Sequence, residues 1–230
     1  MLDRLELLIG ENNINLLKSK TVLIIGLGGV GGHALESIVR SGIGKVIIVD
    51  KDTVDITNLN RQLISTKSNI GQNKVDVAES RINEISNTKV IKIKEFINEN
   101  NIDILFKYQI DYIIDACDTI ETKYLLIKEA ILRNIKIISV MGTAKKMHPE
   151  LLKIMDLKKT SYDPIAKILR KKLRDNHING KLMCISSTEQ PLVKEMGSNS
   201  LVPSTAGILA ASYVINDIVG DLNENSWLFR

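Results

Sequence analysis

The sequence is poor in cysteine, and this shortage limits what the protein can be. It contains only Cys117 and Cys184, and they form no Cys-x-x-Cys pair. A structural zinc site made of four cysteines is therefore impossible. A secreted fold held together by disulfides is implausible, because such folds are dense in cysteine. We expect both thiols to be buried structural groups rather than catalytic nucleophiles.

Long apolar runs are also missing. The chain begins Met-Leu-Asp-Arg, with an early acid and no extended apolar stretch, and this beginning predicts no signal peptide. Residues 201–219 are fairly apolar, but Pro203, Asn216 and Asp217 leave no clean run of about 20 apolar residues. They predict a buried or dimer-facing helix. We therefore expect a cytoplasmic protein with no membrane segment.

The sequence does contain the normal composition of a soluble globular protein, with 44% hydrophobic and 25% charged residues. Its 230 residues suit one large domain, or one domain with a small appendage. The net charge of +4 favours acidic partners only modestly, and such an excess is typical of an ordinary solvated surface.

Strand and helix patterns alternate along residues 1–150. Short apolar runs predict strands at 21–25, 46–49, 90–93, 112–114 and 136–140. Helices are predicted at 4–18, 31–41, 74–84, 97–106 and 121–133. This order predicts an α/β fold, namely a Rossmann-like, doubly wound and mostly parallel sheet. Residues 151–230 are expected to form a small C-terminal α/β extension packed on the same domain, with a helix at 164–174, a strand at 182–186 and a last helix at 205–219.

The most informative stretch begins where the first predicted strand breaks into glycines and then into a helix. The loop reads Gly26-Leu-Gly28-Gly29-Val-Gly31. Such a loop lets the backbone approach a phosphate, with N–H groups at the start of the helix facing the negative charge. Asp50 ends the second predicted strand, the usual place for an acid that accepts hydrogen bonds from ribose hydroxyls. A nucleotide site is predicted, although many dehydrogenases share this loop.

Side chains beyond the loop bear on the kind of nucleotide. Arg61 lies in the string Thr-Asn-Leu-Asn-Arg-Gln, and Lys74 ends the string Gly-Gln-Asn-Lys. An enzyme that binds the pyrophosphate of NAD through its backbone needs neither cation, whereas a triphosphate needs cationic side chains and usually a metal. Asp118 follows the fourth predicted strand, and one carboxylate beside a nucleotide suffices for magnesium. Singly these residues also suit salt bridges or a helix cap, but in this order they predict ATP with Mg²⁺.

In order and spacing these motifs resemble the ThiF/MoeB/ubiquitin-activating family, whose members adenylate a carboxylate with ATP. The resemblance covers residues 4–142 and rests on the glycine loop, Asp50, the Asn-Arg-Gln string, the Gly-x-x-Lys string and Asp-Ala-x-Asp at 115–118. It implies a homodimeric enzyme that uses ATP and Mg²⁺.

The resemblance assigns roles to individual residues. It implies ATP binding by Gly26, Gly28, Gly29, Gly31, Asp50, Asp52, Asn58, Arg61 and Lys74. The metal ligand that it implies is Asp118. Its implied catalytic residues are Arg61, Lys74, Asp118 and Arg4, where Arg4 matches the family's N-terminal arginine that reaches the partner subunit's phosphates. A frayed, charged chain end is the alternative explanation for Arg4.

The second half indicates a branch of the family. Members that activate ubiquitin-like sulfur carriers usually bear two Cys-x-x-Cys pairs, and this chain has none. Three segments resemble the members that act on tRNA, namely residues 156–164, the basic helix at 167–174 and Ser-Ser-Thr-Glu at 186–189. Those members adenylate the carboxylate of threonylcarbamoyladenosine beside the anticodon and cyclise it. The candidate tRNA contacts are Lys167, Arg170, Lys171, Lys172 and Arg174, because phosphate binding needs such cations.

Several alternatives stay open at this point. The basic helix also suits a solvated face whose buried side is Ile168, Leu169 and Leu173. His148 stands where related sequences have aspartate, a departure that bears on substrate contacts and not on ATP binding. A sulfur-transfer protein is a further candidate partner. The competing functions are an adenylating activator of a ubiquitin-like or sulfur-carrier protein, which the missing zinc cysteines disfavour, and an NAD-dependent oxidoreductase, which the cations near the glycine loop disfavour.

Overall fold

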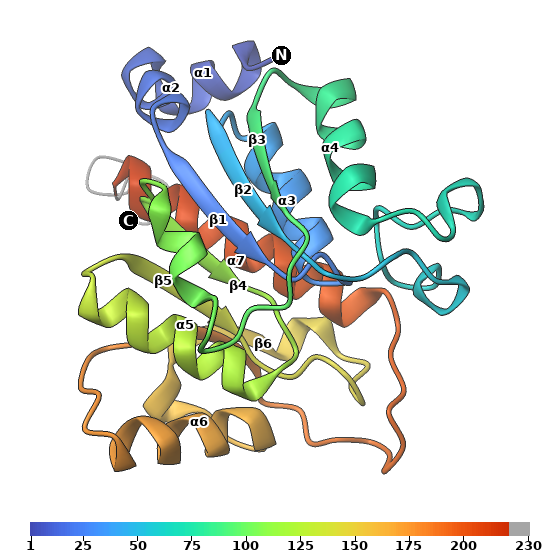
Figure 1. Ribbon diagram of the computed structural model, residues 1–230, viewed down its shortest axis with the longest axis vertical. Coiled ribbons are helices and arrows are strands. Elements are labelled where there is room, and N and C mark those ends of the chain that lie inside the picture. The colour runs from blue at the N-terminus through green and yellow to red at the C-terminus, as the bar shows by residue number, and fades with distance from the viewer. Residues whose placement is uncertain (221–230) are drawn as a thin grey trace, which may run out of the picture.

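Seven strands form one twisted sheet with helices on both faces in the computed structural model, which describes residues 1–220 (Figure 1). The strand order is β3-β2-β1-β4-β5-β7-β6, and every pair is parallel except β6 with β7. The strands are β1 Thr21–Ile25, β2 Lys45–Val49, β3 Lys89–Ile93, β4 Tyr112–Asp115, β5 Lys136–Val140, β6 Leu152–Asp156 and β7 Met183–Ser187. The predicted Rossmann-like, mostly parallel sheet is confirmed.

The helices connect these strands and cover both faces of the sheet. They are α1 Asp3–Ile9, α2 Glu11–Lys18, α3 Gly31–Arg40, α4 Lys74–Ile85, α5 Ile120–Leu132, α6 Pro164–Asp175 and α7 Leu201–Val219. Short 3-10 helices span Ile56–Asn58, Lys67–Asn69, Ile102–Lys107, Pro149–Leu151 and Leu157–Lys159. In Figure 1, α7 passes behind the sheet and α5 lies in front of it.

Alternation along the buried strands produces two cores, one on each face. In β1, Val22 and Ile24 pack with the face covered by α3, α4 and α7, whereas Leu23 and Ile25 pack with the face covered by α5. All of β1 is buried, as expected for a central strand of a parallel sheet. A further cluster joins α5 to α6 and β7, so α6 packs beside α5 and against β7.

The C-terminal segment shares the sheet with the first half of the chain. β7 lies beside β5, and α7 packs closely on α3, where a Cβ atom on Gly207 would come 2.2 Å from the carbonyl oxygen of Val30. Within the described residues, α7 is the one helix long and apolar enough to span a membrane by length and composition alone, and its packing on α3 explains its apolar side as part of the core. The boundary at residue 150 stays a prediction.

Three predicted elements differ from the structure, and one strand was not predicted. The helix at 4–18 is two helices, because Gly10 has a φ of +83°, a conformation that favours glycine. α7 starts at Leu201 rather than Thr205, since Pro203 is tolerated in the first turn of a helix. The helix at 97–106 is the 3-10 helix Ile102–Lys107. β6 was not predicted, because its sequence Leu-Lys-Ile-Met-Asp does not alternate strictly and only Leu152 in it is buried.

Candidate active site

The carboxyl ends of four parallel strands open into one cavity of about 650 Å³ between the sheet, α5 and the first turn of α7. It lies where the strand order reverses between β1 and β4, the usual ligand position in such sheets. Its volume suits a nucleotide-sized ligand. The predicted residues that line it are Gly26, Gly28, Gly29, Asp50, Asp52, Asn58, Arg61, Lys74 and Asp118.

The glycines of the loop do different jobs. Gly26 has a φ of +85°, and a Cβ atom there would come 2.7 Å from the carbonyl oxygen of Ala116. A Cβ atom on Gly31 would lie 1.7 Å from the carbonyl oxygen of Gly26, so Gly31 lets α3 start directly against the strand and does not itself line the cavity. At Gly28 the nearest atom to a Cβ would be 3.8 Å away. Gly28 therefore leaves open space beside the backbone, which is the space a phosphate needs.

Asp50 is tied to the glycine loop from the end of β2. One carboxylate oxygen accepts a 2.6 Å hydrogen bond from the backbone N–H of Leu27, and the other accepts 2.8 Å from that of Asp52. Burial raises the pKa of Asp50 above its ordinary value, although Lys74 and the two backbone donors oppose this rise. Lys74 is only 4% exposed, and its Nζ lies 3.3 Å from Asp52 Oδ2 and 4.0 Å from Asp50 Oδ2.

The loop after β2 brings in the second predicted cation. Asp55 caps the 3-10 helix that follows, and Asn58 closes that turn by accepting from the N–H of Asp55. Arg61 is half-buried and uses Nη1 for the carbonyl oxygen of Thr57 at 2.7 Å and for Asn60 Oδ1 at 2.9 Å. Its Nε and Nη2 donate to no other group among residues 1–220, so the guanidinium keeps donors for an anion.

Asp118 suits a magnesium ion whose other ligands are phosphate oxygens better than a metal site built from protein side chains alone. Its carboxylate is exposed, and its hydrogen-bond partner in the described chain is Thr119 Oγ1 at 3.4 Å. No group of three or more histidine, cysteine or acidic side chains suited to a metal occurs within residues 1–220. Magnesium prefers one or two carboxylates together with phosphate oxygens, and the chemistry of Asp118 beside a nucleotide cavity matches that set.

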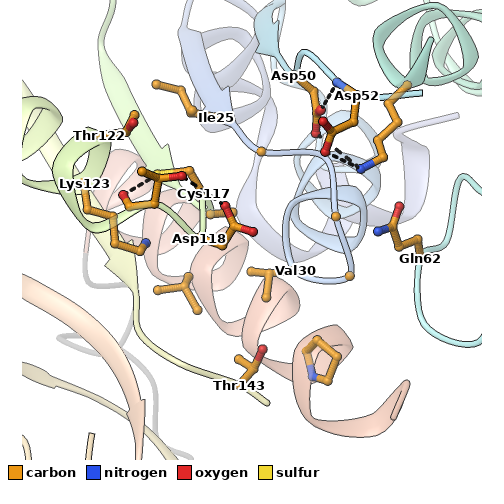
Figure 2. A pocket seen from close by; sticks show the side chains of 18 of the residues that line it. Ile25, Val30, Asp50, Asp52, Gln62, Cys117, Asp118, Thr122, Lys123 and Thr143 are labelled. Atoms are coloured by element: carbon orange, nitrogen blue, oxygen red, sulfur yellow. Dashed lines mark hydrogen bonds and ion pairs between the residues drawn. The ribbon is translucent and has the colours of Figure 1, made fainter. Parts of the chain in front are cut away.

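A buried ion pair beneath the cavity was missed in the sequence. Lys123 is 1% exposed and Asp115 is fully buried, with Lys123 Nζ 3.1 Å from Asp115 Oδ1. Ser139 and the backbone N–H of Cys117 also donate to this carboxylate. Burial lowers the pKa of Lys123, but the Asp115 carboxylate outweighs burial and the pKa lies above its ordinary value. Figure 2 shows Lys123 and Asp118 on one side of the glycine loop, with Asp50 and Asp52 on the other.

A helical pattern could have revealed Lys123. Lys123, Leu126, Ile127 and Ala130 stand at positions i, i+3, i+4 and i+7, and all four are buried. A lysine on the buried stripe of a helix needs a carboxylate nearby, because an unpaired buried charge is costly. Asp115 ends the preceding strand, at the edge of the sheet that this helix approaches.

The two cysteines are held in unreactive surroundings. Cys117 borders the cavity, and burial together with the charge of Asp115 raises the pKa of its thiol. Burial raises the pKa of Cys184 to about 12. A thiol with a raised pKa carries little thiolate and is a poor nucleophile, which supports the structural role expected for both.

The loop after β5 contains His148, the position at which this chain departs from related sequences. His148 does not line the cavity, and its ring lies 2.8 Å from Glu150. Lys146 is 4% exposed, and its Nζ donates 2.8 Å to the carbonyl oxygen of Gly142 and lies 3.6 Å from Asp163. The loop is therefore fixed by a buried lysine and by the residue that caps α6.

The remaining predicted site residues lie away from the cavity. Arg4 is exposed on α1 and does not line the cavity of its own chain. On α6, Lys167, Lys171 and Arg174 are exposed, whereas Lys172 pairs with Glu121 and Arg170 donates to backbone carbonyls. Leu169 and Leu173 are buried as expected, but Ile168 is 41% exposed, because it faces away from α5.

Comparison with known proteins settles the family. The ThiF family model matches residues 2–226, nearly the whole chain. The chain belongs to the ThiF family. The predicted resemblance is thus confirmed, and it disfavours the oxidoreductase alternative.

Several relatives that match most of this ThiF-family chain share one description. The tRNA threonylcarbamoyladenosine dehydratase of Bacillus subtilis is 42% identical over 240 residues, which cover 95% of this chain and 94% of that protein. Its counterpart in Escherichia coli is 32% identical over 190 residues, covering 79% of this chain and 71% of that protein. The crystal structure of E. coli TcdA in complex with ATP superposes with a TM-score of 0.89 at 29% identity, covering 96% of this chain and 94% of that one.

Proposed function

We propose that the chain is an ATP-dependent dehydratase that acts on threonylcarbamoyladenosine in tRNA, beside the anticodon, and converts it to the cyclic form. The observation that carries the proposal is the make-up of one cavity, where the glycine loop, two cations and an exposed carboxylate meet. The choice of substrate is supported by the Bacillus subtilis relative at 42% identity, which is named for this activity. A tRNA substrate also supports the expected cytoplasmic location.

The chemistry explains why ATP is needed. A carboxylate is a poor electrophile, because its leaving group would be oxide. In the first step a carboxylate oxygen bonds to the α-phosphorus of ATP, and pyrophosphate leaves. In the second step the carbamoyl group of the same side chain attacks the acyl carbon and loses a proton, while the bond to AMP breaks and AMP carries away the carboxylate oxygen. Because both reacting groups share one side chain, proximity supplies much of the rate.

The cavity residues mainly handle charge and position. We assign Lys74 and Arg61 to the phosphates, since Lys74 lies at the cavity wall and Arg61 keeps unused donors. Asp118 would hold magnesium, and the chemistry that this ion supplies when bound is neutralisation of charge on the phosphate oxygens. Asp50 would accept hydrogen bonds from the ribose, because its position at the end of β2 places it beside the glycine loop.

A second proposal concerns Arg4 and a homodimer. Arg4 lies on α1 outside its own cavity, in the same helix as Leu7 and Leu8, which are 90% and 75% exposed. Such exposed leucines suit burial against a second subunit, and a symmetric dimer would bring Arg4 of one chain to the phosphates of the other. A sulfur-transfer protein as an additional partner stays a prediction from the resemblance alone.

Mixing two inactive variants tests this arrangement. Each proposed site combines Lys74 of one subunit with Arg4 of the other. A dimer of one Arg4→Ala subunit and one Lys74→Met subunit therefore keeps one site in which both residues are present. We expect an equimolar mixture, after subunit exchange, to recover about a quarter of wild-type turnover. Activity of the mixture no higher than that of the separate variants would place Arg4 outside the partner's site.

The function itself is tested by supplying alternative substrates. The purified protein with ATP and magnesium is given modified tRNA, unmodified tRNA or a carrier protein that ends in Gly-Gly. We expect pyrophosphate release with modified tRNA only, and a digested nucleoside lighter by one water. Release stimulated by the carrier protein alone would instead support the activator function.

A further inference from the structure

A second cavity of about 430 Å³ lies between α6 and the segment that follows it. Its walls come from the 3-10 helix Leu157–Lys159, the C-terminal half of α6 and residues 177–182. It shares no lining residue with the nucleotide cavity, and no step of the proposed reaction uses it. Its volume lies in the usual range for small-molecule sites.

The second cavity combines an apolar floor with a cationic rim. Leu157, Leu173 and Leu182, all at most 8% exposed, contribute to the floor. The basic side chains that line it are Lys158, Arg170, Arg174 and His177. The one acid among its lining residues is Asp156, and its carboxylate is already engaged by the backbone N–H of Lys158. This composition suits a ligand with an apolar body and a negative charge beside it.

Arg170 is the fixed part of this rim. Its Nη1 donates to the carbonyl oxygens of Leu157 at 3.3 Å and of Thr160 at 3.1 Å, and also to the hydroxyl of Thr160. These bonds hold the guanidinium plane against the cavity wall. A held guanidinium is a surface on which an unstacked RNA base can stack, and it pairs well with phosphate.

Helix α6 contributes residues to both cavities, so its length fixes the spacing between these residues. Ile165 in its first turn lines the nucleotide cavity, and Arg174 near its end lines the second. At about 1.5 Å of rise per residue, these positions lie roughly 14 Å apart along the axis. The helix start is anchored, because Asp163 accepts hydrogen bonds from the N–H groups of Gly142 and Ala166 at 3.0 Å each. The second cavity therefore lies within reach of a chain segment that extends a few nucleotides from the first.

We propose that the second cavity binds an unstacked nucleotide of the tRNA, a few residues from the adenosine that reacts. The base lies on the apolar floor beside Arg170, and Lys158 and Arg174 contact its phosphate. This inference rests on the proposed function, because it names how the same substrate is held. It also divides the basic residues of α6: Arg170 and Arg174 line the site, whereas Lys167 and Lys171 do not line it and add only general attraction to RNA.

Two matched charge reversals test the proposal. Lys158, Arg174, Lys167 and Lys171 are all exposed, so Lys158→Glu/Arg174→Glu and Lys167→Glu/Lys171→Glu change the net charge equally without disturbing a buried contact. We expect the first pair to weaken tRNA binding about tenfold or more and the second pair about threefold or less, measured at one fixed salt concentration. ATP binding and the melting temperature serve as controls and stay unchanged in both.

The outcomes separate this proposal from the function on which it rests. Wild-type protein that fails to bind tRNA would overturn the proposed function itself. Wild-type binding that both pairs weaken equally, or neither weakens, would overturn the second cavity and leave the function standing.

A second measurement asks whether a base is bound, using methyl NMR spectra of the protein. Uridine 5′-monophosphate is the probe, and ribose 5-phosphate is its control. We expect shifts at Leu157 and Ile178 with the nucleotide and weaker ones with the sugar phosphate. Equal shifts with both probes would contradict binding of a base.

Discussion

Two buried lysines flank the glycine loop, and they are held in different ways. Lys74 starts α4, is 4% exposed, and has Asp52 at 3.3 Å, an acid whose side chain is 53% exposed. Lys123 lies in α5, is 1% exposed, and has the fully buried Asp115 at 3.1 Å. Both lysines border the same cavity.

The difference lies in how well each carboxylate is already satisfied. Asp115 also accepts from Ser139 and from the N–H of Cys117, so its ion pair with Lys123 forms a closed network beneath the loop that carries Asp118. The nearer partner of Lys74, Asp52, is open to solvent and 3.3 Å away, and the buried Asp50 is 4.0 Å away, so a phosphate can compete for the ammonium group. A buried charge with saturated partners supports structure, whereas one with an exposed, exchangeable partner is available to a ligand.

The largest expected effect follows from breaking the closed network. Lys123→Met leaves the buried Asp115 without its cation, and we expect a loss of about 3–5 kcal/mol in the free energy of unfolding, measured by urea denaturation. Asp115→Asn added to Lys123→Met should recover part of this loss, since the uncompensated charge is gone. A loss below 1 kcal/mol in the single variant would contradict the structural role of this pair.

Lys74→Met should show the opposite profile. We expect turnover to fall on the order of 100-fold to 1000-fold, because a cation aimed at developing phosphate charge is removed. Stability should change much less than in Lys123→Met, since Asp52 is exposed and Asp50 keeps its two backbone donors. Turnover is measured by pyrophosphate release with modified tRNA, and stability by the same urea titration. Equal stability losses at both lysines would remove the distinction between them.

These two lysines also show how far the sequence could lead. Lys74 was found because it belongs to a spaced motif, Gly-x-x-Lys, whose chemistry can be stated from local order. Lys123 was missed because its role in the buried ion pair depends on Asp115 and Ser139. These two residues come from neighbouring strands and meet only in the folded sheet. The parallel sheet followed from short apolar runs, but β6 did not, since only Leu152 of its five residues is buried and its sequence does not alternate strictly.

Asp118→Asn tests the loop that the closed network supports. The variant keeps the side-chain size and removes one negative charge from the proposed metal ligand. We expect the magnesium concentration for half-maximal turnover to rise about tenfold to a hundredfold, while the free energy of unfolding stays within about 0.5 kcal/mol because the side chain is exposed. An unchanged magnesium requirement would remove Asp118 from the metal site.

The smallest effect is expected at an ion cluster on the surface, the exposed counterpart of the buried pairs. Asp76 lies 2.8 Å from Lys92 and 2.5 Å from Lys94, and hydrogen bonds from Lys92 and then Lys94 lower its pKa to about 2. Because the pKa of Asp76 is lower in the folded protein, its carboxylate stabilises the fold at pH values above the ordinary pKa of 3.8. This stabilisation is lost as the pH falls toward 2. Asp76→Asn should therefore reduce stability slightly near neutral pH, and the difference from wild type should shrink both in acid and in high salt, because exposed charges are screened. Urea titrations at pH 6 and pH 3 measure this difference. A large loss of stability that does not depend on salt would contradict this prediction, because the exposed cluster would then behave like the buried pair of Lys123 and Asp115.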